Sequence, residues 1–227
     1  MNAFCVTTGC RELGLRAAAM LLSEVCIAPA PADLRLKIEQ QAGDIQRQFK
    51  TAAHIRRLDA LVAVTDILKH VHVKPRRFPP SSQKLMEYAW KRGTLPAINN
   101  LVDIYNLISI RSALSLGAHD LDQIDCPVQL RLFQGTEHFQ PLGQTQPQPV
   151  VAGEFGYVDG QDRVLCRLDS LQADFSKVTN RTHRVMLIIE TTSHRDDSSL
   201  TEAIDQLEHL LGHYCQARID ALIWPED

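Results

Sequence analysis

Residues 95–121 read LPAINNLVDIYNLISIRSALSLGAHDL, and this stretch decides how the rest of the chain can fold. On a helical wheel with about 100° per residue, Asn99, Asp103 and Asn106 share one narrow arc. Apolar side chains occupy most of the remaining circumference. A surface helix shows the opposite pattern, a broad polar face with one apolar stripe. The pattern therefore predicts a helix over residues 98–110 that is buried on most sides. Its polar stripe would face a hydrogen-bond network or a ligand pocket.

The composition is that of a globular protein of ordinary size. The chain has 227 residues, of which 44% are hydrophobic and 22% charged, and its formal net charge is −3 at pH 7. We expect one domain, with an N-terminal part over residues 1–73 and a motif-bearing core over residues 74–227. The small negative charge gives no signal for nucleic acid over the whole chain. A nucleic-acid partner would therefore require a local basic patch.

The cysteines and the hydrophobic pattern bear on the compartment. Six cysteines are scattered without a Cys-x-x-Cys pair, which is typical of reduced thiols in the cytoplasm. The first residues lack the basic and apolar regions of a signal peptide. No stretch approaches the ~20 apolar residues of a membrane helix. We therefore expect a cytoplasmic protein with no membrane partner.

The first half of the chain is expected to be mostly helical after two strands. Residues 4–8 indicate a strand ended by a glycine, and residues 17–25 have the apolar length of a strand despite their helix-forming composition. Helices are predicted over residues 33–49 and 54–70. After a proline-rich connector, a serine caps a further helix that ends at Gly93.

The second half is expected to be mostly β-structure. Apolar runs predict strands over residues 128–133, 151–158, 163–168, 184–191 and, at a sheet edge, 221–224. The run over 184–191 is typical of a central strand. A DGQD turn predicts a hairpin, and a capping box at Ser199 predicts a helix to about residue 215. The fold class that follows is α+β: a single domain with a mixed, mostly antiparallel sheet and flanking helices.

The central motif resembles a known domain. INNLVDIYNLIS at 98–109, followed by HDLDQI at 119–124, is similar to the editing domain, B3/B4, of the phenylalanyl-tRNA synthetase beta subunit. Three further segments agree in order: LR with QGTE within 130–137, VAGE at 151–154, and KVTNRT at 177–182. The last of these matches free-standing members better than the synthetase. No module for amino-acid activation is visible, so the chain resembles the editing domain as a separate protein.

The resemblance implies a pocket for the amino acid of a misacylated tRNA. It places Asn106 in that pocket, where the polar stripe of the helical wheel also lies. It implies that Glu154, after Gly153, recognises a polar group on the wrong amino acid. A buried acceptor of this kind penalises an apolar competitor, which would leave it unpaired. Asn100 belongs to the same motif, whereas Asp103 is more typical of a structural clasp between a helix and a loop.

Two threonines complete the implied substrate pocket. Thr191 falls where the family's strand forms the opposite wall. Thr182 is either a pocket group or a turn residue, and the sequence leaves both interpretations open.

The implied catalytic residues are Asn106, Glu154 and His119, and one of them departs from the family pattern. The family's spacing, counted from Asn106, would put a pocket histidine at Gly117, but the histidine here is two positions further on. Either His119 takes that role, or backbone N–H groups and a tRNA ribose hydroxyl activate the water. The departure leaves the identity of the amino acid open.

A basic connector and the helix after it are the candidate contacts for the tRNA backbone. These residues are Lys74, Arg76, Arg77, Lys84, Lys91 and Arg92. A solvated charged surface is the alternative interpretation. His209 and His213 have a spacing that can hold a metal, but no third ligand completes a set, so we expect no metal and no cofactor.

The sequence thus predicts a stand-alone hydrolase that deacylates misacylated tRNA. One alternative is a module that binds tRNA or an amino acid without turnover. Another is a hydrolase of small amino-acid esters or amides that does not use tRNA.

Overall fold

α6 (Asn100–Ser112) is the central helix of the fold, as its apolar wheel predicts. Every residue from Asn100 to Ile110 is buried in the computed structural model, which describes residues 3–224. Asn99 begins the helix, because its side-chain oxygen accepts a hydrogen bond from the N–H of Val102. The helix packs against α2 (Ala32–Gln48), α5 (Ser81–Arg92) and α7 (Asp197–Cys215).

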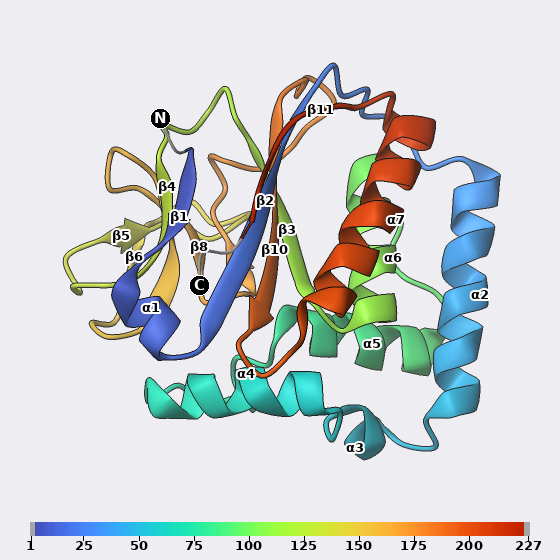
Figure 1. The fold of residues 1–227 in the computed structure, drawn as a ribbon, viewed down its shortest axis with the longest axis horizontal. Coiled ribbons are helices and arrows are strands. Elements are labelled where there is room, and N and C mark those ends of the chain that lie inside the picture. Colours follow the sequence, from blue (N-terminus) through green and yellow to red (C-terminus); the bar gives the residue numbers. More distant parts are fainter. Residues whose placement is uncertain (1–2, 225–227) are drawn as a thin grey trace.

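These helices cover one face of an antiparallel sheet with the strand order β11-β2-β10-β3 (Figure 1). The strands are β2 (Leu15–Ser23), β3 (Ser115–Asp120), β10 (Val185–Thr192) and β11 (Arg218–Ile223). β10 is fully buried between β2 and β3, which confirms that this apolar run is a central strand. Its side chains alternate: Leu187 and Ile189 pack on the helices, and Met186 and Ile188 face the second sheet.

The second sheet has five strands in the order β1-β4-β7-β8-β9. They are β1 (Phe4–Val6), β4 (Val128–Leu132), β7 (Phe155–Val158), β8 (Val164–Arg167) and β9 (Leu171–Gln172). β1 and β4 are parallel and the other pairs are antiparallel. β5 (His138–Phe139) and β6 (Gln148–Pro149) form a separate pair. The α+β class with mixed, mostly antiparallel strands is confirmed, although the described strands form three sheets and not one.

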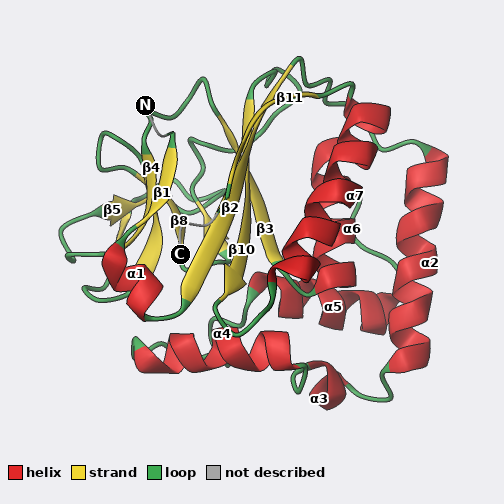
Figure 2. Cartoon of the chain, viewed as in Figure 1, coloured by secondary structure: helices red, strands yellow, loops and turns green. Residues whose placement is uncertain are grey.

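The layers are clear in Figure 2, where the strands gather on one side and most of the helices on the other. Three shorter helices complete the chain: α1 (Thr8–Glu12), α3 (Ala52–Ile55) and α4 (Asp59–His70). Val64 and Leu68 of α4 join the core between the two sheets. Segments from both sides of the division expected at residue 73 contribute to both large cores. Within residues 3–224, no helix combines the length and apolar character needed to cross a membrane.

Several element boundaries differ from the sequence predictions. The helix expected over 54–70 is two helices, α3 and α4. The capping box at Ser199 is wrong, because α7 begins at Asp197 with Asp196 as its N-cap residue. The strand expected over 151–158 begins only at Phe155, because Gly153 has a φ of +85° and turns the chain.

Candidate functional site

A cavity of about 290 Å³ opens beside β3, where α5, α6 and the loop between β8 and β9 meet. A pocket of about 30 Å³ adjoins it between the two sheets and shares Gly117, His119 and Asp169 with it. We call the two together the β3 cavity. Its polar side chains are Ser81, Lys84, Tyr105, Asn106, Ser115, His119, Tyr157, Asp169, Ser170, Gln172 and Glu190.

The α6 wall of the β3 cavity contains Asn106, as the helical wheel and the resemblance both predict. Asn106 is 8% exposed and lies beside Val102 and Tyr105 in the cavity lining. Its side chain makes no hydrogen bond with any other residue of the described part of the chain. The amide is therefore free to bind a ligand.

The β3 wall follows the alternation of a strand. Ser115, Gly117 and His119 lie on one face, and Glu190 of β10 is the register partner of Ser115. A Cβ atom placed on Gly117 would meet no atom within 4 Å. The cavity therefore contains open space where the family spacing would put a histidine side chain.

Two carboxylates form the floor of the β3 cavity, that of the buried Glu190 and that of the half-buried Asp169. Glu190 Oε2 accepts a 2.5 Å hydrogen bond from the Tyr157 hydroxyl. Asp169 Oδ2 accepts from the Ser115 hydroxyl at 2.7 Å and from the N–H of Ser81 at 2.9 Å. Burial, together with the charge of Asp169, raises the pKa of Glu190 to about 8. Burial also raises the pKa of Asp169.

His119 is a neutral imidazole at pH 7. It is 3% exposed, and burial lowers its pKa to about 4. Its Nδ1 lies 3.0 Å from Ser176 Oγ, and this contact holds the ring orientation. Cys166 lines the same cavity, but burial raises the pKa of its thiol, which keeps it protonated. The cavity therefore contains a neutral base and no thiolate nucleophile.

Asn100 is a structural residue in this fold. Its amide donates to the carbonyl oxygens of Cys26 and Tyr214, at 2.9 and 2.8 Å, and its Oδ1 accepts from the N–H of Ala28. These bonds fasten the start of α6 to the end of α7 and to the loop before α2, which leaves no part of the amide for a substrate.

Asp103 is the second clasp at the start of α6. Its two oxygens accept from the N–H of Ile98 at 3.0 Å and from the Arg35 guanidinium at 2.9 Å. This is the helix-to-loop contact that the sequence indicated for Asp103.

The structure does not bring Glu154 to Asn106 and His119. Both oxygens of Glu154 accept hydrogen bonds from Arg167, at 2.6 and 2.9 Å, in a largely buried ion pair. Glu154 and Gly153 lie before β7, and neither is part of the lining of the β3 cavity. The ion pair therefore joins the residue before β7 to the last residue of β8.

The two predicted threonines also lie outside the cavity lining. The Thr182 hydroxyl donates to Asp120 at 2.6 Å and accepts from the N–H of Thr179, which is the turn arrangement. Thr191 is buried in β10 opposite Arg16 of β2.

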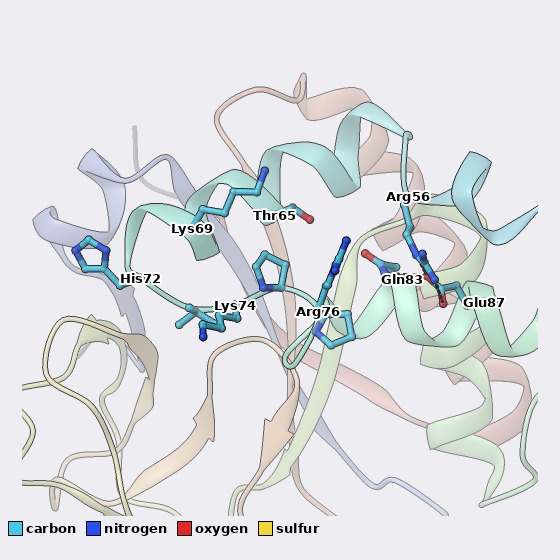
Figure 3. A pocket seen from close by; sticks show the side chains of 11 residues that line it. Arg56, Thr65, Lys69, His72, Lys74, Arg76, Gln83 and Glu87 are labelled. Carbon is cyan, nitrogen blue, oxygen red and sulfur yellow. Dashed lines mark hydrogen bonds and ion pairs between the residues drawn. The ribbon is translucent and has the colours of Figure 1, made fainter.

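A second depression, of about 960 Å³, lies between α4 and α5 (Figure 3). We call it the basic groove, and its cationic residues are Arg56, Lys69, Lys74 and Arg76. Figure 3 shows Lys74 and Arg76 on the connector that joins the two helices, and Arg56 paired with Glu87 of α5. Lys74 and Arg76 are exposed and have no ion-pair partner among residues 3–224.

The six predicted tRNA contacts therefore lie in three places. Lys74 and Arg76 line the basic groove, whereas Lys84 lies at the mouth of the β3 cavity. The guanidinium of Arg77 lies 5.2 Å from the centre of the Phe78 ring. Lys91 and Arg92 are exposed at the other end of α5.

The described residues contain no group of three or more His, Cys, Asp or Glu side chains that could hold a metal ion. His209 and His213 stack on each other along α7, with ring centres 6.5 Å apart.

Asp169, Glu190, Ser81 and Ser170 are cavity residues that the sequence did not single out. Glu190 carried a usable signal, because it is the one acidic residue within the apolar run that became β10. The sequence around Asp169 and Ser170 gives no such signal, because these residues reach α5 only when the loop after β8 has folded.

Comparison with protein-family models and with solved structures shows what this chain is similar to. The family model described as the B3/4 domain matches residues 52–216. A crystal structure of an N-terminal fragment of the phenylalanyl-tRNA synthetase beta subunit from Pyrococcus horikoshii is similar, with a TM-score of 0.51 at 12% identity. The similarity covers 99% of this chain and 54% of that one, so this chain spans about half of the fragment. At this identity, the likeness is one of fold. No curated protein gives a sequence match.

Proposed function

Because the chain belongs to the B3/4 domain family, we propose that it is a stand-alone hydrolase that removes a wrongly attached amino acid from tRNA. The observation that carries this proposal is the β3 cavity, whose lining contains Asn106, His119 and the carboxylates of Asp169 and Glu190. The aminoacyl group would occupy this cavity. The activity would belong to the cytoplasm, where aminoacyl-tRNA is made and used.

The basic groove supplies the contact for the tRNA backbone in this proposal. α5 separates the groove from the β3 cavity: Gln83 and Glu87 line the groove, and Ser81 and Lys84 line the cavity. A tRNA end that crosses α5 would therefore meet Lys74 and Arg76 with its phosphates and Lys84 near the mouth of the cavity. Cations that neutralise phosphates give an affinity that falls steeply with salt.

Ester hydrolysis requires an oriented water and a place for its proton. A water oxygen attacks the ester carbonyl, its proton passes to a base, and the ribose oxygen leaves as a hydroxyl. His119 is uncharged at pH 7 and can accept that proton or orient the water. Asn106 would donate a hydrogen bond to the carbonyl oxygen as negative charge develops on it.

A panel of mischarged tRNAs tests the proposal. The wild type should deacylate one or a few members, and Asn106→Ala and His119→Ala should each lower the rate about 100-fold. Asn180→Ala is the matched control, because Asn180 is exposed in a turn. Glu154→Ala tests whether the acidic group of the site is Glu154, as the resemblance implies, or the carboxylates of the β3 cavity. Loss of activity without loss of folding would restore Glu154 to the site, whereas unchanged activity favours Asp169 and Glu190. No deacylation of any member would reject the hydrolase.

A binding module without turnover is the second candidate, and the surroundings of His119 favour it. The low pKa of His119 makes it a weak base, and the thiol of Cys166 is protonated. Salt-sensitive tRNA binding without deacylation would establish this alternative. A salt-indifferent affinity for small amino-acid esters would instead indicate that tRNA is not the substrate.

A further inference from the structure

Four buried polar oxygens of the β3 cavity have no hydrogen-bond partner in the described chain. They are Ser81 Oγ, Asp169 Oδ1, Ser170 Oγ and Glu190 Oε1. A buried acceptor without a donor costs about 1–3 kcal/mol, and a carboxylate costs more. Their residues all line the β3 cavity, and this favours a polar ligand that forms several hydrogen bonds there.

Both carboxylates are held in place by their other oxygen. Tyr157 fixes Glu190 through Oε2, and Ser115 and Ser81 fix Asp169 through Oδ2. Glu190 is 4% exposed, so solvent does not satisfy its free oxygen. The free oxygen of Glu190 is thus held on β10 and that of Asp169 in the turn after β8, and each can accept hydrogen bonds once its carboxyl group is ionised.

No cation of the β3 cavity forms an ion pair with these acids within residues 3–224. Neither Asp169 nor Glu190 has a salt-bridge partner among residues 3–224. Lys84 is exposed at the mouth, where its charge acts on Asp169, and His119 is neutral. Two carboxylates with two hydroxyls match an ammonium group, which has one positive charge, three donors and no acceptor.

We propose that Asp169 and Glu190 bind the free α-ammonium group of the aminoacyl substrate, and that the site therefore rejects aminoacyl esters whose amine is acylated. This inference rests on the proposed function and names its substrate class. Acylation removes the positive charge, and an N-acyl substrate would leave the buried acids without a cation. The hydroxyl of Ser81 or Ser170 would accept the remaining N–H group.

The protonation state of Glu190 gives a second way to test the proposal, because ligand binding should change it. Burial and the charge of Asp169 raise the pKa of Glu190 to about 8, so Glu190 keeps its proton at pH 7 when the cavity is empty. An ammonium group stabilises the ionised carboxylate. Binding at pH 7 is therefore expected to release a proton, which calorimetry in two buffers of different ionisation enthalpy measures. Tyr157, Cys166 and His119 face the same floor and do not titrate between pH 6 and 8.

The experiment compares each hydrolysed aminoacyl-tRNA with its N-acetylated form. The wild type should prefer the free amine by at least 100-fold in kcat/KM. Asp169→Asn and Glu190→Gln keep the shape of the cavity and should reduce that preference to below about 10-fold. Asp196→Asn, outside the cavity at the N-cap of α7, is the matched control and should keep the full preference. Equal hydrolysis of both forms by the wild type, or a preference that survives both variants, would overturn the inference. A changed preference among amino-acid side chains with an unchanged preference for the amine would also overturn it.

A binding experiment separates this inference from the hydrolase proposal. Amino-acid amides and their N-acetyl forms serve as probes, titrated by calorimetry. Binding of amides only, with no deacylation of any tRNA, supports the ammonium site and rejects the hydrolase. Deacylation with no preference for the free amine supports the hydrolase and rejects the ammonium site. Neither binding nor deacylation rejects both.

Discussion

The hydroxyl of Tyr157 in β7 donates a 2.5 Å hydrogen bond to Glu190 in β10, and this contact joins the two large sheets beneath the β3 cavity. Both residues are buried, at 4% exposure each. The position of the Glu190 carboxylate therefore depends on how the two sheets pack. The same hydrogen bond contributes to the stability of the fold and to the geometry of the site.

Tyr157→Phe should destabilise the protein by about 1–3 kcal/mol, because it leaves Glu190 Oε2 without a donor in a buried position. Tyr88→Phe removes the same hydroxyl from an exposed tyrosine of α5 and should change the stability by less than about 0.5 kcal/mol. Urea unfolding of the two variants measures both values. An equal effect of the two changes would mean that the bond contributes nothing.

Glu190→Gln should stabilise the protein increasingly as the pH rises from 5 to 8. The native state keeps the Glu190 proton to a pKa of about 8, whereas an unfolded glutamate releases it above its ordinary pKa of 4.5. The wild type therefore loses stability over this interval, and glutamine removes that loss. The variant's advantage should grow by about 2–4 kcal/mol. Denaturant unfolding at several pH values measures it, and an advantage that does not change with pH would show that Glu190 is ionised in the fold.

Asn100→Ala should cost about 2–4 kcal/mol, since it removes three part-buried hydrogen bonds, to the backbone of Ala28, Cys26 and Tyr214. Asn106→Ala removes an identical side chain that makes no hydrogen bond in the described chain, so its effect should stay below about 1 kcal/mol. Thermal and urea unfolding compare the two. A larger loss for Asn106→Ala would contradict a ligand role for that side chain.

Lys74→Glu with Arg76→Glu should weaken tRNA binding and lower the slope of log affinity against log salt by about 1 for each contact removed. Lys91→Glu with Arg92→Glu makes the same change of charge at the far end of α5 and should act less. Filter binding at several salt concentrations measures both slopes. Equal slopes for the two variants would remove the basic groove as the contact.

Gly117→Ala should leave the fold intact and hinder the substrate. The added Cβ meets no atom within 4 Å and the backbone is an ordinary strand, so the stability should change by less than about 1 kcal/mol. The methyl group would extend into the cavity and raise KM. Steady-state deacylation tests this, and an unchanged KM would place the aminoacyl group elsewhere.

The sequence predicts the buried elements well and the site only in part. α6 and β10 follow from their apolar patterns, because burial on most sides is visible along the chain itself. Asn106 follows from the same pattern, whereas the assignment of Glu154 relied on a short glycine–glutamate match. That match carries no information about Arg167, which folding brings to the carboxylate.

The residues that complete the cavity show the physical limit of such prediction. Asp169 lies in a loop and contacts Ser115 and the N-terminus of α5. The hydrophobic periodicity of the sequence does not predict a contact made by a loop. Glu190 looks like the polar end of a strand until the second sheet covers it. A cavity is a property of several distant segments, so its floor becomes visible only in three dimensions.

The place of β2 between β10 and β11 has a consequence for how the protein is made. β2 is synthesised well before both of its partners, β10 and β11. Its two edges therefore stay unpaired until those strands have been made, and unpaired strand edges are where nascent chains associate wrongly. Pairings this far apart in sequence also close slowly. Recovery of folded protein should depend on what protects this strand until β10 and β11 have been synthesised.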